Sequence, residues 1–136
     1  MNKRVTIDPV TRIEGHLRVD VVDHLGALRH LLEADIGTAN GAAAHPSITT
    51  AVAAACHQAP GVSSVVNGRF KGGYITRHYG QPAHHVHAVQ LEKCQSLYMQ
   101  EVPPFAYDEA RAAQIQPVLK AMVGAALQAA GALYGH

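Results

Sequence analysis

The sequence contains only two cysteines, Cys56 and Cys94, which lie far apart in the chain. They form no C-x-x-C pair, so the sequence predicts neither a disulfide framework nor a cluster of thiolate metal ligands. This sparing use of cysteine fits a reducing cytoplasm, which is the compartment that we expect.

Strong charge and long apolar runs are also lacking. The net charge is +1 and 15% of the residues are charged, which argues against nucleic acid or an acidic membrane surface as a partner. No apolar run follows the basic residues at the N-terminus, and Gly124, Gln128 and Gly131 interrupt the alanine-rich C-terminal segment before it could span a bilayer. We expect a soluble, unexported protein whose 136 residues build one core.

What the chain does have is a dense group of polar residues between positions 66 and 101. Arg69, Lys71, Arg77 and His78 surround the pair Gly72-Gly73. A glycine pair is typical of a place where the backbone takes unusual dihedral angles or comes close to another group. The pattern predicts an anion site, although solvated loop arginines would give the same spacing.

The spacing of apolar residues, together with the positions of proline and glycine, predicts an α/β fold. Short strands are expected at residues 4–7, 17–22, 62–66, 74–76 and 86–91. The first two should form a hairpin, the third should be buried, and the last should point Val89 and Leu91 into the core. Residues 25–33 are expected to form a helical turn or two, and residues 35–44 a loop.

Two helices are also predicted. Pro46 suits the first turn of a helix, where its missing N–H costs nothing. Apolar residues then recur at four-residue spacing: Ile48, Val52 and Cys56. Asp108 suits the N-cap of a second helix over residues 109–133. Its apolar stripe would be Ile115, Leu119, Met122, Val123 and Leu127. Pro117 is expected to kink this helix or to start a new one.

Residues from about 35 to about 128 resemble the C-terminal part of the N-formylglutamate amidohydrolase (N-formylglutamate deformylase) family of histidine degradation. The matching words are IGTANGA, VNGRFKGGYITRHYG, VHAVQLE, YMQE followed by PPF, and PVLKAM. The resemblance implies the C-terminal portion of an α/β/α sandwich, similar to zinc carboxypeptidases in the phosphorylase/hydrolase-like class. It also implies hydrolysis of the formamide C–N bond of N-formyl-L-glutamate to formate and L-glutamate, with zinc or cobalt as the divalent metal.

The resemblance assigns roles to several polar residues. Glu92 matches the family's general base, and the alternative is a strand-end carboxylate that pairs with Lys93. His78 matches a catalytic position, and His87 a substrate-binding one, from which they would orient the substrate or stabilise an oxyanion. A small dicarboxylate needs cationic donors in fixed positions, and arginine gives bidentate geometry. The remaining substrate-binding candidates are Arg69, Lys71 and Arg77.

The expected metal ligands are not identifiable in this chain. In the family the N-terminal half supplies them, and here that half is absent or replaced, which suggests a truncated or chimeric protein and a second chain that completes the fold. The cluster His84, His85 and His87 invites a zinc interpretation, because His85 and His87 would point the same way on a strand. The family, however, has a small residue where His85 stands.

Residues 4–23, RVTIDPVTRIEGHLRVDVVD, are similar to a different family, the large subunits of nickel-iron hydrogenases. Glu14 falls where those enzymes use a glutamate in proton transfer. A nickel-iron centre needs four cysteine thiolates, so the two cysteines exclude it. This resemblance divides the chain into a segment 1–34 and a segment 35–136. It also leaves two alternatives to an amidohydrolase: a non-catalytic anion-binding fragment, or a hydrogenase-related structural fragment.

Overall fold

The computed structural model describes residues 5–7, 16–24 and 34–135. They form a mixed five-stranded sheet in the order β1-β2-β5-β3-β4. β1 (Val5–Ile7) is antiparallel to β2 (His16–His24), which is parallel to the long strand β5 (Val86–Cys94). On its other side β5 is antiparallel to β3 (Ala34–Gly37), and β3 is parallel to β4 (Ser64–Val66). The predicted hairpin of the first two strands is confirmed.

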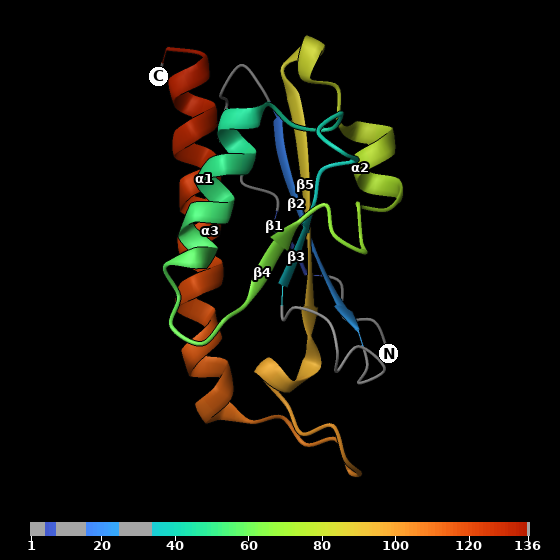
Figure 1. Cartoon of the computed structure of the whole chain (residues 1–136), viewed down its shortest axis with the longest axis vertical. Coiled ribbons are helices and arrows are strands. Elements are labelled where there is room, and N and C mark those ends of the chain that lie inside the picture. The colour runs from blue at the N-terminus through green and yellow to red at the C-terminus, as the bar shows by residue number, and fades with distance from the viewer. Residues whose placement is uncertain (1–4, 8–15, 25–33, 136) are drawn as a thin grey trace.

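Helices cover both faces of the sheet (Figure 1). α1 (Pro46–His57) and α3 (Glu109–Leu133) pack side by side on one face, and the short α2 (Tyr74–Tyr79) lies on the other. Two short 3-10 turns, Pro82–His84 and Gln95–Leu97, flank β5. The order is therefore helix pair, sheet and short helix, and β5 runs through the middle.

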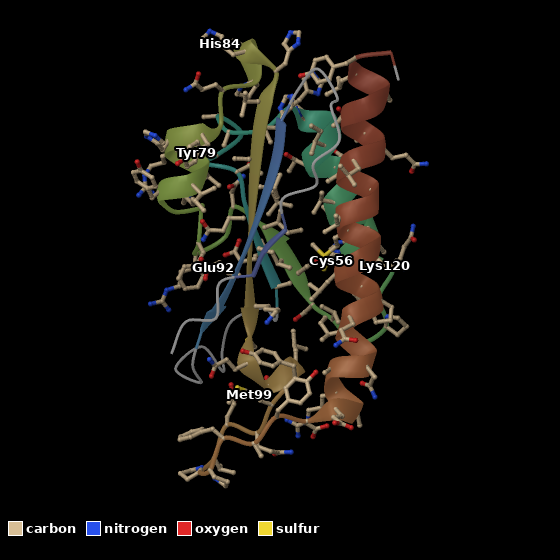
Figure 2. The ribbon with its side chains drawn as sticks, turned by 180° about the vertical axis from the view of Figure 1, so that it is seen from behind. Cys56, Tyr79, His84, Glu92, Met99 and Lys120 are labelled. Atoms are coloured by element: carbon tan, nitrogen blue, oxygen red, sulfur yellow. The ribbon has the colours of Figure 1, made fainter. Side chains whose placement is uncertain are left out.

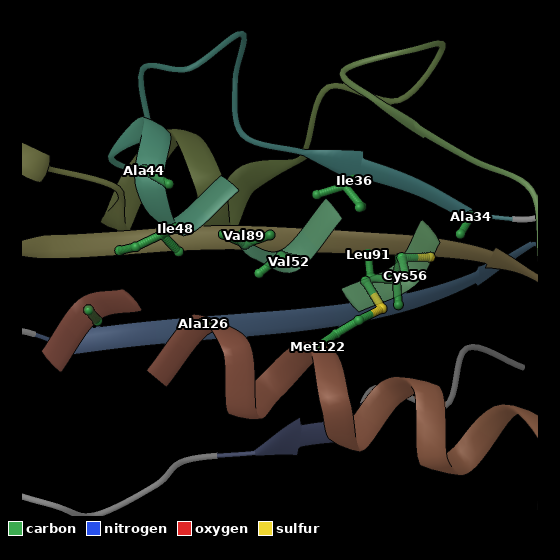
Figure 3. Packing of buried hydrophobic residues seen from close by; sticks show 11 residues of the cluster. Ala34, Ile36, Ala44, Ile48, Val52, Cys56, Val89, Leu91, Met122 and Ala126 are labelled. Carbon is green, nitrogen blue, oxygen red and sulfur yellow. The ribbon is translucent and has the colours of Figure 1, made fainter. Parts of the chain in front are cut away.

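The apolar core lies between the sheet and the α1–α3 pair (Figure 3). Its buried members are Ala34, Ile36, Ala44, Ile48, Val52, Cys56, Val89, Leu91, Met122, Ala126 and Ala130. The four-residue spacing in α1 and the inward face of β5 are confirmed. Each fully buried large apolar side chain in such a core stabilises the fold by about 1.5–3 kcal/mol.

The long helix α3 begins as predicted, and its predicted apolar stripe is confirmed in part: Ile115 and Met122 are buried, whereas Leu119, Val123 and Leu127 are half-buried. Asp108 caps it, and its side chain accepts a hydrogen bond from the backbone N–H of Arg111 at 3.0 Å. The helix runs through Pro117 without starting anew. Its buried residues are mainly small: Ala112, Ile115, Met122, Ala126, Ala130 and Gly131. Small side chains let α3 approach α1 closely, which a stripe of large residues would not. None of the helices among the described residues is long and apolar enough to cross a membrane.

Two strand predictions need correction. Residues 74–76 belong to helix α2, whose first turn is closed by the backbone N–H of Arg77 donating to the carbonyl oxygen of Gly73 at 3.2 Å. Thr76 Oγ1 donates to the same oxygen at 2.9 Å. β4 is an edge strand and its Val66 is 38% exposed, so the predicted burial of this segment is wrong. The predicted helical turn at residues 25–33 lies outside the described residues.

Candidate functional site

The loops that follow β3 and β4 meet at the same end of the sheet, because the two strands are parallel. Asn67, which follows β4, joins them: its Oδ1 accepts from the backbone N–H of Thr38 at 2.8 Å, and its Nδ2 donates to Thr38 Oγ1 at 2.8 Å. Asn67 has a φ of 49°, a left-handed conformation that asparagine adopts more readily than most residues. In open α/β sheets, ligands bind beyond the carboxyl ends of the strands, so this end of the sheet is a candidate site.

The glycine-rich loop, residues 67–73, is fastened to the sheet at both ends. The buried carboxylate of Asp35 accepts from the backbone N–H groups of Gly68 at 3.1 Å and Phe70 at 2.8 Å. At the far end, Gln90 Oε1 accepts from the backbone N–H of Gly73 at 2.7 Å. The loop backbone is therefore held in one place, and its side chains are displayed from a fixed base.

Close packing requires two glycines where the loop meets β3: Gly37 at the end of the strand and Gly72 in the loop. A Cβ added to Gly37 would lie 2.4 Å from the backbone nitrogen of Gly72. Gly72 has a φ of +96°, and a Cβ there would lie 2.2 Å from Thr76 Oγ1. The predicted unusual dihedral angles and close approach are confirmed, and the group that the loop approaches is the backbone at the end of β3.

Glu92 is buried on β5, on the side of the sheet that carries α2 (Figure 2). Its Oε1 accepts a hydrogen bond from Gln90 Nε2, two residues earlier on the same strand face. The alternative pairing with Lys93 is not favoured, because Lys93 faces the other way and its Nζ lies 3.9 Å from the ring centroid of Tyr98. Hydrogen bonds thus connect the backbone N–H of Gly73 to the side chain of Gln90, and Gln90 to the carboxylate of Glu92.

The three predicted cations, Arg69, Lys71 and Arg77, are all exposed on or beside this loop. Arg77 Nη1 donates to the carbonyl oxygen of Gly72 at 3.1 Å. The guanidinium carbon of Arg69 lies 5.8 Å from the ring centroid of Phe70. The structure therefore places each of the three cations on or directly after the glycine-rich loop, exposed at the surface.

His78 is exposed on α2, and its ring stacks on Tyr74 with centroids 4.7 Å apart. The ring of Tyr79 meets it edge-on, with centroids also 4.7 Å apart. These contacts account for the position of the imidazole on the outer helix. Its catalytic role stays a prediction.

His87 is buried on the opposite face of β5 from Glu92, toward the helix pair. Its Nδ1 accepts from the backbone N–H of His45 at 3.1 Å, so the ring proton is on Nε2, which lies 2.5 Å from the hydroxyl of Tyr134. Burial, and then the charges of His45 and His85, lower the pKa of His87 below its ordinary value. The structure does not bring His87 together with the glycine-rich loop, and its substrate-binding role stays a prediction.

The described residues contain no group of three histidine, cysteine, aspartate or glutamate side chains that could hold a metal ion. His85 precedes β5 in a left-handed turn with a φ of 60°, so the assumed strand spacing of His85 and His87 is wrong. Its ring stacks on Tyr134 with centroids 4.5 Å apart. The family's expected zinc or cobalt does not fit the residues of this part of the chain.

The sequence analysis did not predict the residues whose hydrogen bonds hold the glycine-rich loop in place. Asp35 was placed in a loop, although it lies in β3 directly opposite Glu92. Gln90 could have been found, because strand alternation alone puts it on the same face as Glu92. Asn67 stands before a glycine, a pair typical of turns, but nothing in the sequence indicates its bond to Thr38.

Comparisons with known proteins identify relatives of this chain. The family model for N-formylglutamate amidohydrolase matches residues 8–99. The N-formylglutamate deformylases of Pseudomonas putida and Pseudomonas aeruginosa are 53% and 50% identical over 93 residues, which are 68% and 65% of this chain. Those residues are 35% of each relative, so the chain spans about a third of the length of the curated relatives it matches.

The fold has a solved counterpart. The crystal structure of N-formylglutamate amidohydrolase from Ralstonia eutropha JMP134 aligns with a TM-score of 0.68 and 18% identity, covering 87% of this chain and 45% of that one. The family model begins at residue 8, inside the segment that resembles hydrogenases, and these matches do not support that resemblance. β2 also pairs with β5, although the boundary after residue 34 itself stays a prediction. Because the family model matches more than half of the sequence, the chain belongs to the N-formylglutamate amidohydrolase family.

Proposed function

We propose that this chain supplies the substrate-binding and general-base part of an N-formylglutamate deformylase. The observation that carries the proposal is the chain of hydrogen bonds from Gly73 through Gln90 to Glu92. It connects a loop with exposed cations on it and directly after it to a buried carboxylate. The two Pseudomonas relatives bear the name of that activity.

The glycine-rich loop would hold the two carboxylates of N-formyl-L-glutamate. Arg69 and Arg77 can each bind a carboxylate through two parallel N–H groups, and Lys71 adds a third positive charge. All three side chains are exposed in the described structure, so a ligand can reach them without opening the core.

Glu92 would act as the general base. It takes a proton from the water that attacks the formyl carbon, and the proton then passes to the departing nitrogen as the C–N bond breaks, giving formate and L-glutamate. For this step the attacking water must lie within about 2.6–3.2 Å of the carboxylate.

The metal-binding part of the site would come from outside the described residues. We propose that a second chain, or a segment of the family fold beyond the portion matched here, completes a zinc-carboxypeptidase-like sandwich and brings the ligands for zinc or cobalt. Such a metal would supply Lewis-acid activation of the water.

The test is formate release from N-formyl-L-glutamate with added zinc or cobalt. The chain alone should be slow or inactive, and a polypeptide carrying the rest of the family fold, supplied in trans, should raise the rate. Glu92→Gln should then lower the rate about 10²–10⁴-fold, as expected for loss of a general base. The control is Glu109→Gln, which removes an exposed carboxylate from the first turn of α3.

An unchanged rate in Glu92→Gln would place the base elsewhere. If the substrate binds but is hydrolysed under none of these conditions, the result would support the non-catalytic anion-binding alternative instead.

A further inference from the structure

Gln90 is a buried amide, 5% exposed, at the centre of β5 between the glycine-rich loop and Glu92. A backbone N–H can only donate, so the Gln90 oxygen must be the atom that faces Gly73, at 2.7 Å. The amide nitrogen must then face Glu92, to whose Oε1 it donates. The orientation of the amide is fixed by its neighbours, which removes the usual ambiguity between its two ends.

This orientation has a consequence for Glu92. An amide N–H donates to a carboxylate oxygen more strongly than to a protonated carboxyl, so it favours the ionised form that a base requires. The same bond restrains Oε1 of Glu92, because the Gln90 side chain is itself held by Gly73.

We propose that Gln90 is a positioning residue: it couples the glycine-rich loop to the Glu92 carboxylate, holding that carboxylate ionised and in one orientation. The inference rests on the proposed function only for the role of Glu92 as base. The coupling itself is a property of the chain without substrate.

The surroundings explain why such a device is needed. Asp35 and Glu92 are opposite one another on neighbouring strands, and two like charges so placed repel. The Asp35 carboxylate is compensated by the N–H groups of Gly68 and Phe70. Gln90 performs the corresponding task for Glu92, and it draws its own orientation from Gly73, in the same loop.

The coupling can be measured by NMR on the chain alone. In the wild type, the Gln90 side-chain amide and the Gly73 backbone amide should shift with pH at the same midpoint as the Glu92 carboxyl carbon. Amide signals that ignore the titration of Glu92 would overturn the proposal without any variant.

Two substitutions separate the two bonds of Gln90. Gln90→Leu removes both, so hydrogen exchange at the Gly73 amide should accelerate and the Glu92 titration should move to higher pH. Gln90→Glu is nearly isosteric and keeps an acceptor for Gly73, so that amide should stay protected. The Glu92 titration should again move to higher pH, because two carboxylates would then share the site.

The matched control is Gln100→Leu, which also removes a glutamine-to-carboxylate bond, the 3.0 Å contact from Nε2 to Asp108. It should change neither signal. A Glu92 midpoint that is the same in wild type and in both Gln90 variants would refute the coupling.

These readouts need neither substrate nor turnover. If they appear as expected while N-formyl-L-glutamate fails to bind, the proposed function fails and the coupling stands. If the substrate binds and is hydrolysed through Glu92 while the readouts are absent, only the role of Gln90 is lost.

Discussion

Asp35→Asn tests whether a buried carboxylate shapes the glycine-rich loop. The wild-type side chain accepts two backbone hydrogen bonds, at 3.1 Å from Gly68 and 2.8 Å from Phe70. Asparagine has one acceptor oxygen, so one of these N–H groups would face an NH₂ donor. A hydrogen bond to a charged group contributes about 1.5–3 kcal/mol. Relief of the repulsion between Asp35 and Glu92 would offset about 0.2–1 kcal/mol of the loss.

The expected net loss is about 0.5–3 kcal/mol in the free energy of unfolding, measured by urea denaturation. Amide hydrogen exchange at Gly68 or Phe70 should accelerate in the same variant. The control is Glu109→Gln, which removes an exposed carboxylate from the first turn of α3; its interaction with the helix dipole contributes about 0.3–1 kcal/mol, so the cost should stay below about 1 kcal/mol. Wild-type stability and wild-type protection of both amides in Asp35→Asn would refute the reasoning.

Three further predictions follow from the geometry. Arg77→Ala should weaken binding of N-formyl-L-glutamate by about 1–3 kcal/mol in calorimetry, whereas Lys120→Ala, which removes an exposed charge from α3, should leave the affinity unchanged. Gly37→Ala should destabilise the fold by about 1–3 kcal/mol, because the new Cβ would meet backbone at 2.4 Å; Gly124→Ala, with open space around it on α3, should stabilise it by about 0.5–1 kcal/mol. Burial lowers the pKa of His87, so as the pH falls below about 6.5 the unfolded chain takes up a proton first. Stability should therefore decline on acidification, and denaturation midpoints of His87→Gln should show a smaller decline; equal declines would contradict this.

Residues whose signal repeats along the chain could be predicted. Ile48, Val52 and Cys56 recur along one helix face, and all three are buried. Asp108 precedes a long helical segment and caps it. Both features depend on neighbours within a few positions, which the sequence states directly.

Features that depend on distant partners could not be predicted. Residues 74–76 look like a strand in the sequence, but the backbone N–H of Arg77 and the hydroxyl of Thr76 both bond the carbonyl oxygen of Gly73 and form a helical turn. A helix of six residues is also too short to show a period. The predicted burial of β4 was wrong because β4 lies at the edge of the sheet. The order of the strands cannot be inferred from the residues of β4 alone.

The candidate site shows the same division. Glu92 and the exposed cations were predicted from motif and chemistry. The carboxylate of Asp35 and the amide of Gln90 were not, because their partners are 33 and 17 positions away. His87 matched the family word, yet the alternation of β5 puts it on the face opposite Glu92.

The central claim is that the glycine-rich loop holds a dicarboxylate beside Glu92. The most direct measurement is an amide NMR titration of the chain with N-formyl-L-glutamate, set against its dimethyl ester, which lacks both negative charges. The account predicts that shifts from the acid concentrate in residues 67–73, at Arg77 and at the Gln90 side chain, and that the ester produces none. Equal shifts from acid and ester, or shifts confined to α3, would contradict it.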